Sequence, residues 1–231
     1  SLVEKLIDFV DFLSDLSAVP KSCFGVTGSI LLGIHNPEFS DIDLTVYGYL
    51  NSKKVKDSVL EAFSDGVSLI KRLSKDDAYA WCTRKSIEHS IKFGDAKRIL
   101  ERKWCIGVFD GVRFSINPAR TEAESERYGD RFYFPIGYGK VRAVVSDDRE
   151  AIFTLAKYVV EGVNILTGPR GIDLREVASY EGIYTDIAYR GEKIEARGKI
   201  ELVDDRLTGD SYHRLLVGTL EGMGSDYIIK L

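Results

Sequence analysis

The chain has 231 residues and a formal net charge of -4; 44% of its residues are hydrophobic and 29% are charged. This composition is typical of a globular protein with a real core, and the acidic balance argues against broad electrostatic binding of nucleic acid. The sequence contains no apolar run of the roughly 18 residues that span a bilayer, so no membrane partner is expected.

The first predicted element is a helix, because apolar residues recur at helical spacing from Leu2 to Leu16. This segment lacks the basic flank of a signal peptide, and the three cysteines form no CxxC pair. We therefore expect a cytoplasmic protein. A short strand is predicted over 23–27, followed by Gly28-Ser29 and a helical turn that ends at Gly33.

The segment from Asp41 to Tyr47 alternates strictly between two kinds of residue. Asp41, Asp43 and Thr45 share one side, and apolar residues share the other, which predicts a half-buried strand. A loop over 35–40, which contains Pro37, joins this strand to the Gly-Ser pair.

The next elements are predicted to be helical up to about Arg102. One helix begins at Ser52 and ends at Asp65-Gly66, and a polar, basic segment over 75–102 follows with a break at Gly94. Its cations form either a solvated helix face or contacts to the phosphates of a nucleotide or RNA. The basic positions in and just before this segment are Lys71-Arg72, Arg84-Lys85, Lys92 and Lys97-Arg98.

A hairpin is predicted over 105–116, because two β-rich runs flank the turn residues Asp110-Gly111. Asn117-Pro118 is expected to end it. The polar segment 121–138 then reads as a junction, and short β-branched and aromatic runs dominate from 139 onward. The expected strands are KVRAVVS, IFTLAKYVVEGV (with a helix as the alternative), GIYTDIAY, EKIEARGKIELV, YHRLLVGTL and DYIIKL.

These elements predict an α+β protein with two domains. Residues 1–120 would form a mixed sheet with flanking helices, 121–138 the junction, and 139–231 a small, mainly-β, barrel-like domain. The tyrosines and arginines of the second domain either stack on single-stranded nucleic acid or belong to a small β core. They are Tyr180, Tyr184, Tyr189, Arg190 and Arg197.

Two aspartates at positions i and i+2 of a strand point to the same side, where their repulsion needs a cation. Mg²⁺ binds one or two carboxylates and completes its shell with water and substrate phosphates, so Asp41 and Asp43 predict an Mg²⁺ (or Mn²⁺) site for a nucleotide. Gly28 allows the backbone to approach a ligand closely, and Ser29 offers a hydroxyl and a backbone N–H to phosphate oxygens. Alternatively, Ser29 caps the short helix.

Gly28-Ser29, a spacer of eleven residues and Asp41-Ile42-Asp43 together resemble the signature of the DNA polymerase β-like nucleotidyltransferases. The wording "GSILLG" and "SDIDLTVYG" is similar to the minimal and predicted archaeal members, and the likeness covers residues 1–118. The resemblance implies that Gly28 and Ser29 hold the triphosphate of an NTP and that Asp41 and Asp43 bind the metal and act in catalysis. The acceptor would be RNA, a protein hydroxyl or a small molecule.

The family usually has a third carboxylate on a neighbouring strand, and this sequence departs from that pattern. The strand after the hairpin turn offers Ser115 and Asn117 on its polar side, and Asp110 lies in the turn itself. We therefore keep two alternatives to an active transferase. One is a catalytically degenerate module that binds nucleotide or RNA, and the other is a modifier of a partner protein.

Overall fold

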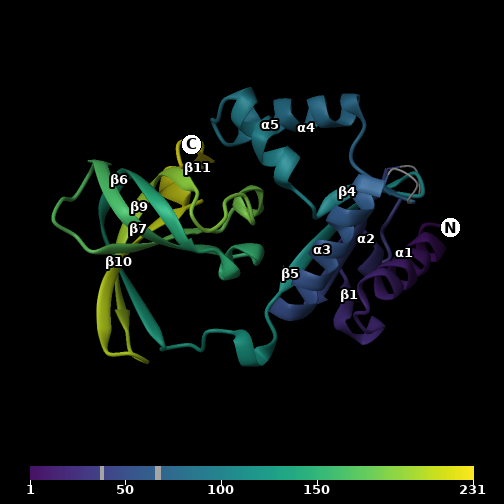
Figure 1. The fold of residues 1–231 in the computed structure, drawn as a ribbon, viewed down its shortest axis with the longest axis horizontal. Helices are drawn as coiled ribbons and strands as arrows, with labels where there is room; N and C mark the ends of the chain where they lie inside the picture. The colour runs from purple at the N-terminus through teal and green to yellow at the C-terminus, as the bar shows by residue number, and fades with distance from the viewer. Residues whose placement is uncertain (37–38, 66–68) are drawn as a thin grey trace. The chain divides into compact units, whose positions relative to one another are not determined.

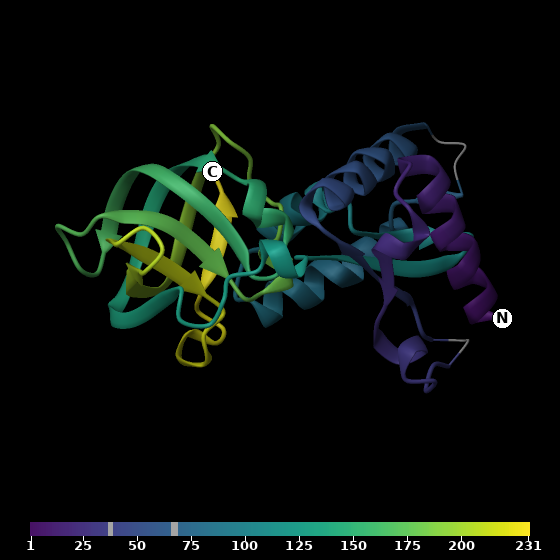
Figure 2. The same ribbon diagram turned by 90° about the horizontal axis from the view of Figure 1, so that it is seen from below.

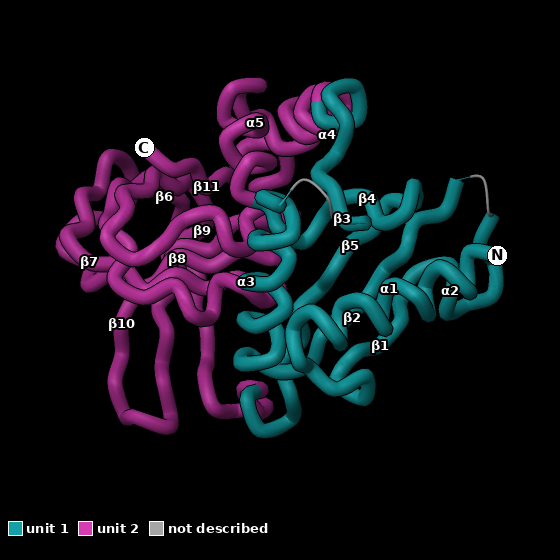
Figure 3. The backbone as a smooth tube through the Cα atoms, turned by 45° about the vertical axis from the view of Figure 1, so that its right-hand side comes forward, with its two compact units in different colours: residues 1–78, 103–124 teal, residues 79–102, 125–231 magenta. Residues whose placement is uncertain are grey.

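The computed structural model describes residues 1–36, 39–65 and 69–231, and it confirms the α+β class (Figure 1). Two compact units divide the chain: unit 1 comprises 1–78 and 103–124, and unit 2 comprises 79–102 and 125–231 (Figure 3). Residues 79–102, which the sequence placed in the first domain, thus belong to unit 2. Within the described ranges, no helix has the length and apolar character needed to cross a bilayer.

Unit 1 is built on a five-stranded mixed sheet with the order β1-β2-β5-β4-β3. β2 and β5 are parallel, and the other pairs are antiparallel. Its elements are α1 (Leu2–Ser17), β1 (Phe24–Val26), α2 (Gly28–Leu31), β2 (Ile42–Tyr47), α3 (Tyr49–Asp65), β3 (Ile70–Lys71), β4 (Ile106–Phe109) and β5 (Val112–Ala119), with 3-10 turns at Lys21–Cys23 and Glu122–Glu124.

Helices α1 and α3 cover one face of this sheet (Figures 1 and 3). α1 begins with a capping box between Ser1 and Glu4, and the ring of Phe9 lies 4.7 Å from those of Phe109 and Phe114. Burial of each such ring contributes about 1.5–3 kcal/mol. The apolar side of β2 is fully buried on this face, so the polar side of the strand, with Asp43, belongs to the opposite face.

The hairpin prediction is confirmed. β4 and β5 pair antiparallel, and Asp110 and Gly111 have φ of 43° and 82°, as a turn with two left-handed central residues requires. Pro118 does not end β5, which continues to Ala119. Pro37 and Gly66, on which two other predictions depended, lie outside the described residues.

The basic segment after β3 folds into two helices, α4 (Lys75–Glu88) and α5 (Phe93–Arg102). The predicted break at Gly94 is wrong, because Gly94 lies in the first turn of α5. The chain turns at 89–92 instead, where Ser90 takes a φ of 50°. Helix α3 also starts three residues before the predicted Ser52, at Tyr49.

The strands of unit 2 close into a barrel (Figure 2). Around it the order is β6-β7-β8-β10-β9 and back to β6, with β11 added beside β9. β8 and β10 are parallel, and the remaining pairs are antiparallel. The strands are β6 (Arg131–Asp147), β7 (Ala156–Thr167), β8 (Leu174–Ser179), β9 (Lys193–Asp205), β10 (Asp210–Val217) and β11 (Tyr227–Lys230), with 3-10 turns at Arg149–Ile152, Gly182–Tyr184 and Leu220–Gly222.

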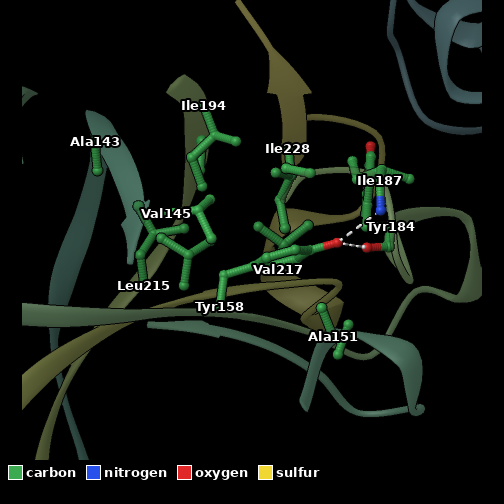
Figure 4. Packing of buried hydrophobic residues seen from close by; sticks show 14 of the residues in the cluster. Ala143, Val145, Ala151, Tyr158, Tyr184, Ile187, Ile194, Leu215, Val217 and Ile228 are labelled. Carbon is green, nitrogen blue, oxygen red and sulfur yellow. Dashed lines mark hydrogen bonds between the residues drawn. The ribbon is translucent and has the colours of Figure 1, made fainter. Parts of the chain in front are cut away.

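Two predictions for this half are corrected. β6 begins at Arg131, inside the predicted junction, because residues 131–139 pair with β9 despite Pro135 and an irregularity beside it. The run GIYTDIAY is a 3-10 turn and loop, not a strand. Its residues Tyr184 and Ile187 instead fill the barrel core, where the Tyr158 hydroxyl donates to the Tyr184 carbonyl at 2.6 Å and accepts from Ile187 N at 3.0 Å (Figure 4).

Candidate functional site

The predicted acidic pair lies at the start of β2. Asp43 is the second residue of the strand and is half-buried, while Asp41 directly precedes the strand and is exposed. Asp41 lies two residues before Asp43, and Asp43 lies on the face of the sheet that α1 and α3 leave uncovered. We call this the open face of the sheet.

Gly28 and Asp43 fit each other closely. Gly28 has a φ of +67°, and a Cβ added to it would collide with the Asp43 carboxylate. The backbone is held here because Thr27 N donates to the Asp43 carbonyl at 3.0 Å. Position 28 therefore requires glycine, because the Asp43 carboxylate packs against its main chain.

Ser29 does not cap α2, because Thr27 is the N-cap residue and makes no side-chain capping bond. The Ser29 hydroxyl instead donates to Ser40 Oγ at 3.2 Å, and Ser40 Oγ accepts from Asn36 N at 2.9 Å. These bonds connect the turn after Gly28 to Ser40, which directly precedes Asp41. Ser40 begins the segment SDIDLTVYG, but no role was predicted for its side chain.

The residue of β5 that faces Asp43 is a serine. β2 and β5 pair with Asp43 opposite Ser115, whose hydroxyl donates to Asp43 Oδ1 at 2.6 Å. Asn117 Nδ2 in turn donates to Ser115 Oγ at 3.1 Å. Of the three candidates, the structure brings Ser115 and Asn117 to the site.

Asp110 is not part of this group. It lies five residues before Ser115, about 16 Å along an extended strand. Its carboxylate forms an ion pair with Lys5 of α1 at 2.6 Å. The hairpin turn and this ion pair explain why an aspartate stands at position 110.

The donor set fits a magnesium ion that takes much of its coordination from a substrate. Asp41 and Asp43 supply hard oxygen ligands on one side of the strand, and the Ser115 hydroxyl is adjacent. Among the described residues no three acids, histidines or cysteines gather around one point.

The aromatic residues singled out in unit 2 divide into buried and exposed ones. Tyr184 is fully buried and belongs to the core, which excludes it from a stacking surface, whereas Tyr180 is 55% exposed. The Tyr189 ring already carries the guanidinium of Arg102 at 4.6 Å from its centroid. Many of the predicted basic residues are also paired along their own helices, as in Lys85–Glu88 and Arg98–Asp95.

Unit 2 buries charged groups in pairs. Arg214 is 3% exposed; its Nε donates to Glu201 at 2.8 Å, and its guanidinium lies 3.5 Å from the centre of the Tyr133 ring. Glu195 accepts from Lys140, Arg142 and Tyr227; burial alone raises the pKa of its carboxyl, but these bonds lower it below the usual value.

Asp226 is the exception in unit 2. It is 6% exposed, and its Oδ2 has no hydrogen-bond partner. Burial raises the pKa of its carboxyl to about 6, against a usual value of 3.8. The group therefore carries an electrostatic cost at neutral pH that the pairs above avoid.

Comparison with known proteins gives one significant relative. Uncharacterized protein MJ1086 of Methanocaldococcus jannaschii is 34% identical over 212 residues, which cover 91% of this chain and 59% of the relative. The chain thus spans about three fifths of that protein's length. No family model matches the chain, and no solved structure matches it.

Proposed function

We propose that unit 1 is a magnesium-dependent nucleotidyltransferase of the DNA polymerase β-like type, which moves an NMP group from an NTP to an acceptor hydroxyl. The observation that carries the proposal is the contact between Gly28 and Asp43. A residue of the Gly-Ser pair and one of the two aspartates are in direct contact, although fourteen residues separate them in the chain. This contact between two parts of the sequence signature supports the proposal of a single site.

The residues have separate roles in this proposal. Asp41 and Asp43 would hold Mg²⁺ or Mn²⁺, and the backbone around Gly28 and Ser29 would bind the triphosphate. A metal ion held there would supply positive charge to the α-phosphate and to the departing pyrophosphate. Ser115 holds the Asp43 carboxylate in place through Oδ1. The cysteines of the described chain are free thiols, in keeping with a cytoplasmic protein.

A binding module without catalysis is the second candidate function, and Ser115 favours it. A serine hydroxyl is a poor general base, and it leaves the site with two carboxylates. The barrel of unit 2 supports the same candidate. Counted from β6, its order is first, second, third, fifth, fourth, with the third and fifth strands parallel, which resembles the OB-fold that often binds oligonucleotides.

Label transfer separates the two candidates. The full chain is incubated with each α-labelled NTP, Mg²⁺ or Mn²⁺, and total RNA or whole lysate as the source of acceptors, beside the Asp41→Asn/Asp43→Asn variant. Asp15→Asn, which removes an exposed acid of α1, serves as the matched control. Label transfer that is lost in the double variant and kept in the control supports the enzyme. Nucleotide binding without label transfer under either metal supports the binding module and contradicts the enzyme.

A further inference from the structure

The order of the sheet gives the proposed site two different sides. β2 lies between β1, which leads into Gly28-Ser29, and β5, which continues to β4 and β3. In an in-line displacement the attacking hydroxyl and the leaving pyrophosphate lie on opposite sides of the phosphorus. If Gly28 and Ser29 hold the leaving side, the acceptor approaches over β5, β4 and β3.

The strand register shows which side chains meet an acceptor there. Paired residues of adjacent strands point to the same face. Asp43, Ser115 and Ile106 therefore form one row on the open face. Two residues earlier along β5, Arg113, Val108 and Lys71 form the next row on the same face. The burial agrees: Lys71 and Arg113 are exposed, and the alternating residues Ile70 and Phe114 are buried.

This second row is positively charged. β3, β4 and β5 contain no aspartate or glutamate, and their charged residues are Lys71 and Arg113. Neither side chain has an ion pair or hydrogen bond among the described residues. Arg72, by contrast, donates to the Lys103 carbonyl at 3.3 Å and lies over the Phe63 ring. With two strand spacings between them, the backbones of Lys71 and Arg113 are about 10 Å apart.

We propose that the acceptor carries phosphate groups and that Lys71 and Arg113 bind them. This inference rests on the proposed transferase function and names the acceptor class of that same site. Two unpaired cations whose backbones are about 10 Å apart, each on a long side chain, can reach two phosphates of a strand or the phosphate of a small ester. A cationic acceptor, such as an aminated sugar, would meet repulsion on these three strands.

The transfer step itself is balanced without further reagents. The acceptor oxygen forms a bond to the α-phosphorus, and the bond from that phosphorus to the bridging oxygen breaks. The bridging oxygen keeps the electron pair and leaves with pyrophosphate, and the acceptor's proton passes to water. Lys71 and Arg113 touch the acceptor's own phosphates and take no part in the proton transfer.

Fluorescence anisotropy of a labelled oligouridylate tests the inference. The full-length wild type is compared with Lys71→Ala, Arg113→Ala and the double variant. Lys54→Ala, which removes an exposed cation of α3, is the matched control. We expect the double variant to bind at least 10-fold more weakly, and the slope of log K against log salt to fall by about 0.7 for each lost phosphate contact. Arg113→Lys should restore part of the affinity.

Competition distinguishes the two sources of phosphate. Displacement by unlabelled oligouridylate but not by UMP at equal phosphate concentration identifies a strand, and displacement by both identifies a small phosphate ester. Binding that the double variant and Lys54→Ala retain equally, or no binding by the wild type, overturns the inference. The Asp43-dependent label transfer is read separately, so it can persist when this inference fails.

Discussion

With the exception of Asp226, the buried charges described in unit 2 have partners, whereas Asp41, Lys71 and Arg113 of unit 1 have none among the residues that the structure describes. Arg214 and Glu201 neutralise each other inside the barrel, as Glu195 and its two cations do at its edge. Asp41, Lys71 and Arg113 make no ion pair within the described part of the chain. Unpaired charge on an exposed sheet face contributes little to stability, and in the proposed function these groups bind ligand instead.

The largest effect is expected where a buried pair in unit 2 is broken. Glu201→Ala leaves the buried Arg214 without its closest partner, and we expect a loss of about 3 kcal/mol in the free energy of unfolding. Urea denaturation followed by circular dichroism measures it. Asp57→Ala breaks the exposed Lys53–Asp57 pair and should cost less than about 0.5 kcal/mol. Equal losses in the two variants would contradict the contrast between the units.

Asp226→Asn should stabilise the protein at neutral pH. Because the folded pKa of about 6 exceeds the usual 3.8, folding favours the protonated acid. The favourable contribution is present below pH 4 and is lost as pH rises through 6. The variant should therefore gain about 2 kcal/mol over wild type at pH 7.5 and little at pH 4. A gain that does not change between these two pH values would show that burial of the charge is not its cause.

Gly28→Ala tests the contact beneath Asp43. The new Cβ adds a collision with the carboxylate to the strain of a positive φ, and we expect nucleotide affinity to fall and stability to drop by about 2 kcal/mol. Gly33→Ala is the matched control, because Gly33 has the same φ of +67° but nothing within 4 Å of its added Cβ. The difference between the two variants isolates the collision. Identical behaviour would mean that Asp43 moves aside without consequence.

The smallest effect concerns the missing acid. Ser115→Asp places a third carboxylate beside Asp43, and we expect Mn²⁺ to bind about 10-fold more tightly, a difference of about 1.4 kcal/mol. Ser115→Asn, which adds a similar volume without charge, is the control. Calorimetric titration of the metal measures both. Weaker Mn²⁺ binding by the aspartate variant would show that the metal does not lie between the two strands.

The features that the sequence predicted correctly are those that depend on residues close together in the chain. Alternation identified β2 and the polar side on which Asp43 lies, and the Asp110-Gly111 turn identified the hairpin, because both depend on neighbouring residues. The hydrogen bond from Ser115 to Asp43 depends on the register of two strands 72 residues apart in sequence, which no local pattern determines. For the same reason the start of β6 was not predicted, because its pairing with β9 continues through Pro135. The residues around Tyr184 have the pattern of a strand, but they form a turn because their side chains pack in the barrel core.

β9 has a consequence for the dynamics of the barrel. One edge of β9 pairs with β6 along nearly the whole length of β9. On the other edge of β9, residues 194–197 pair with β11 and residues 199–205 pair with β10. Almost every backbone amide of β9 is thus enclosed between two neighbours. In hydrogen–deuterium exchange these amides should be the slowest of the barrel and should report its global opening, whereas the amides of residues 131–139 of β6, which pair with β9 alone, should exchange earlier.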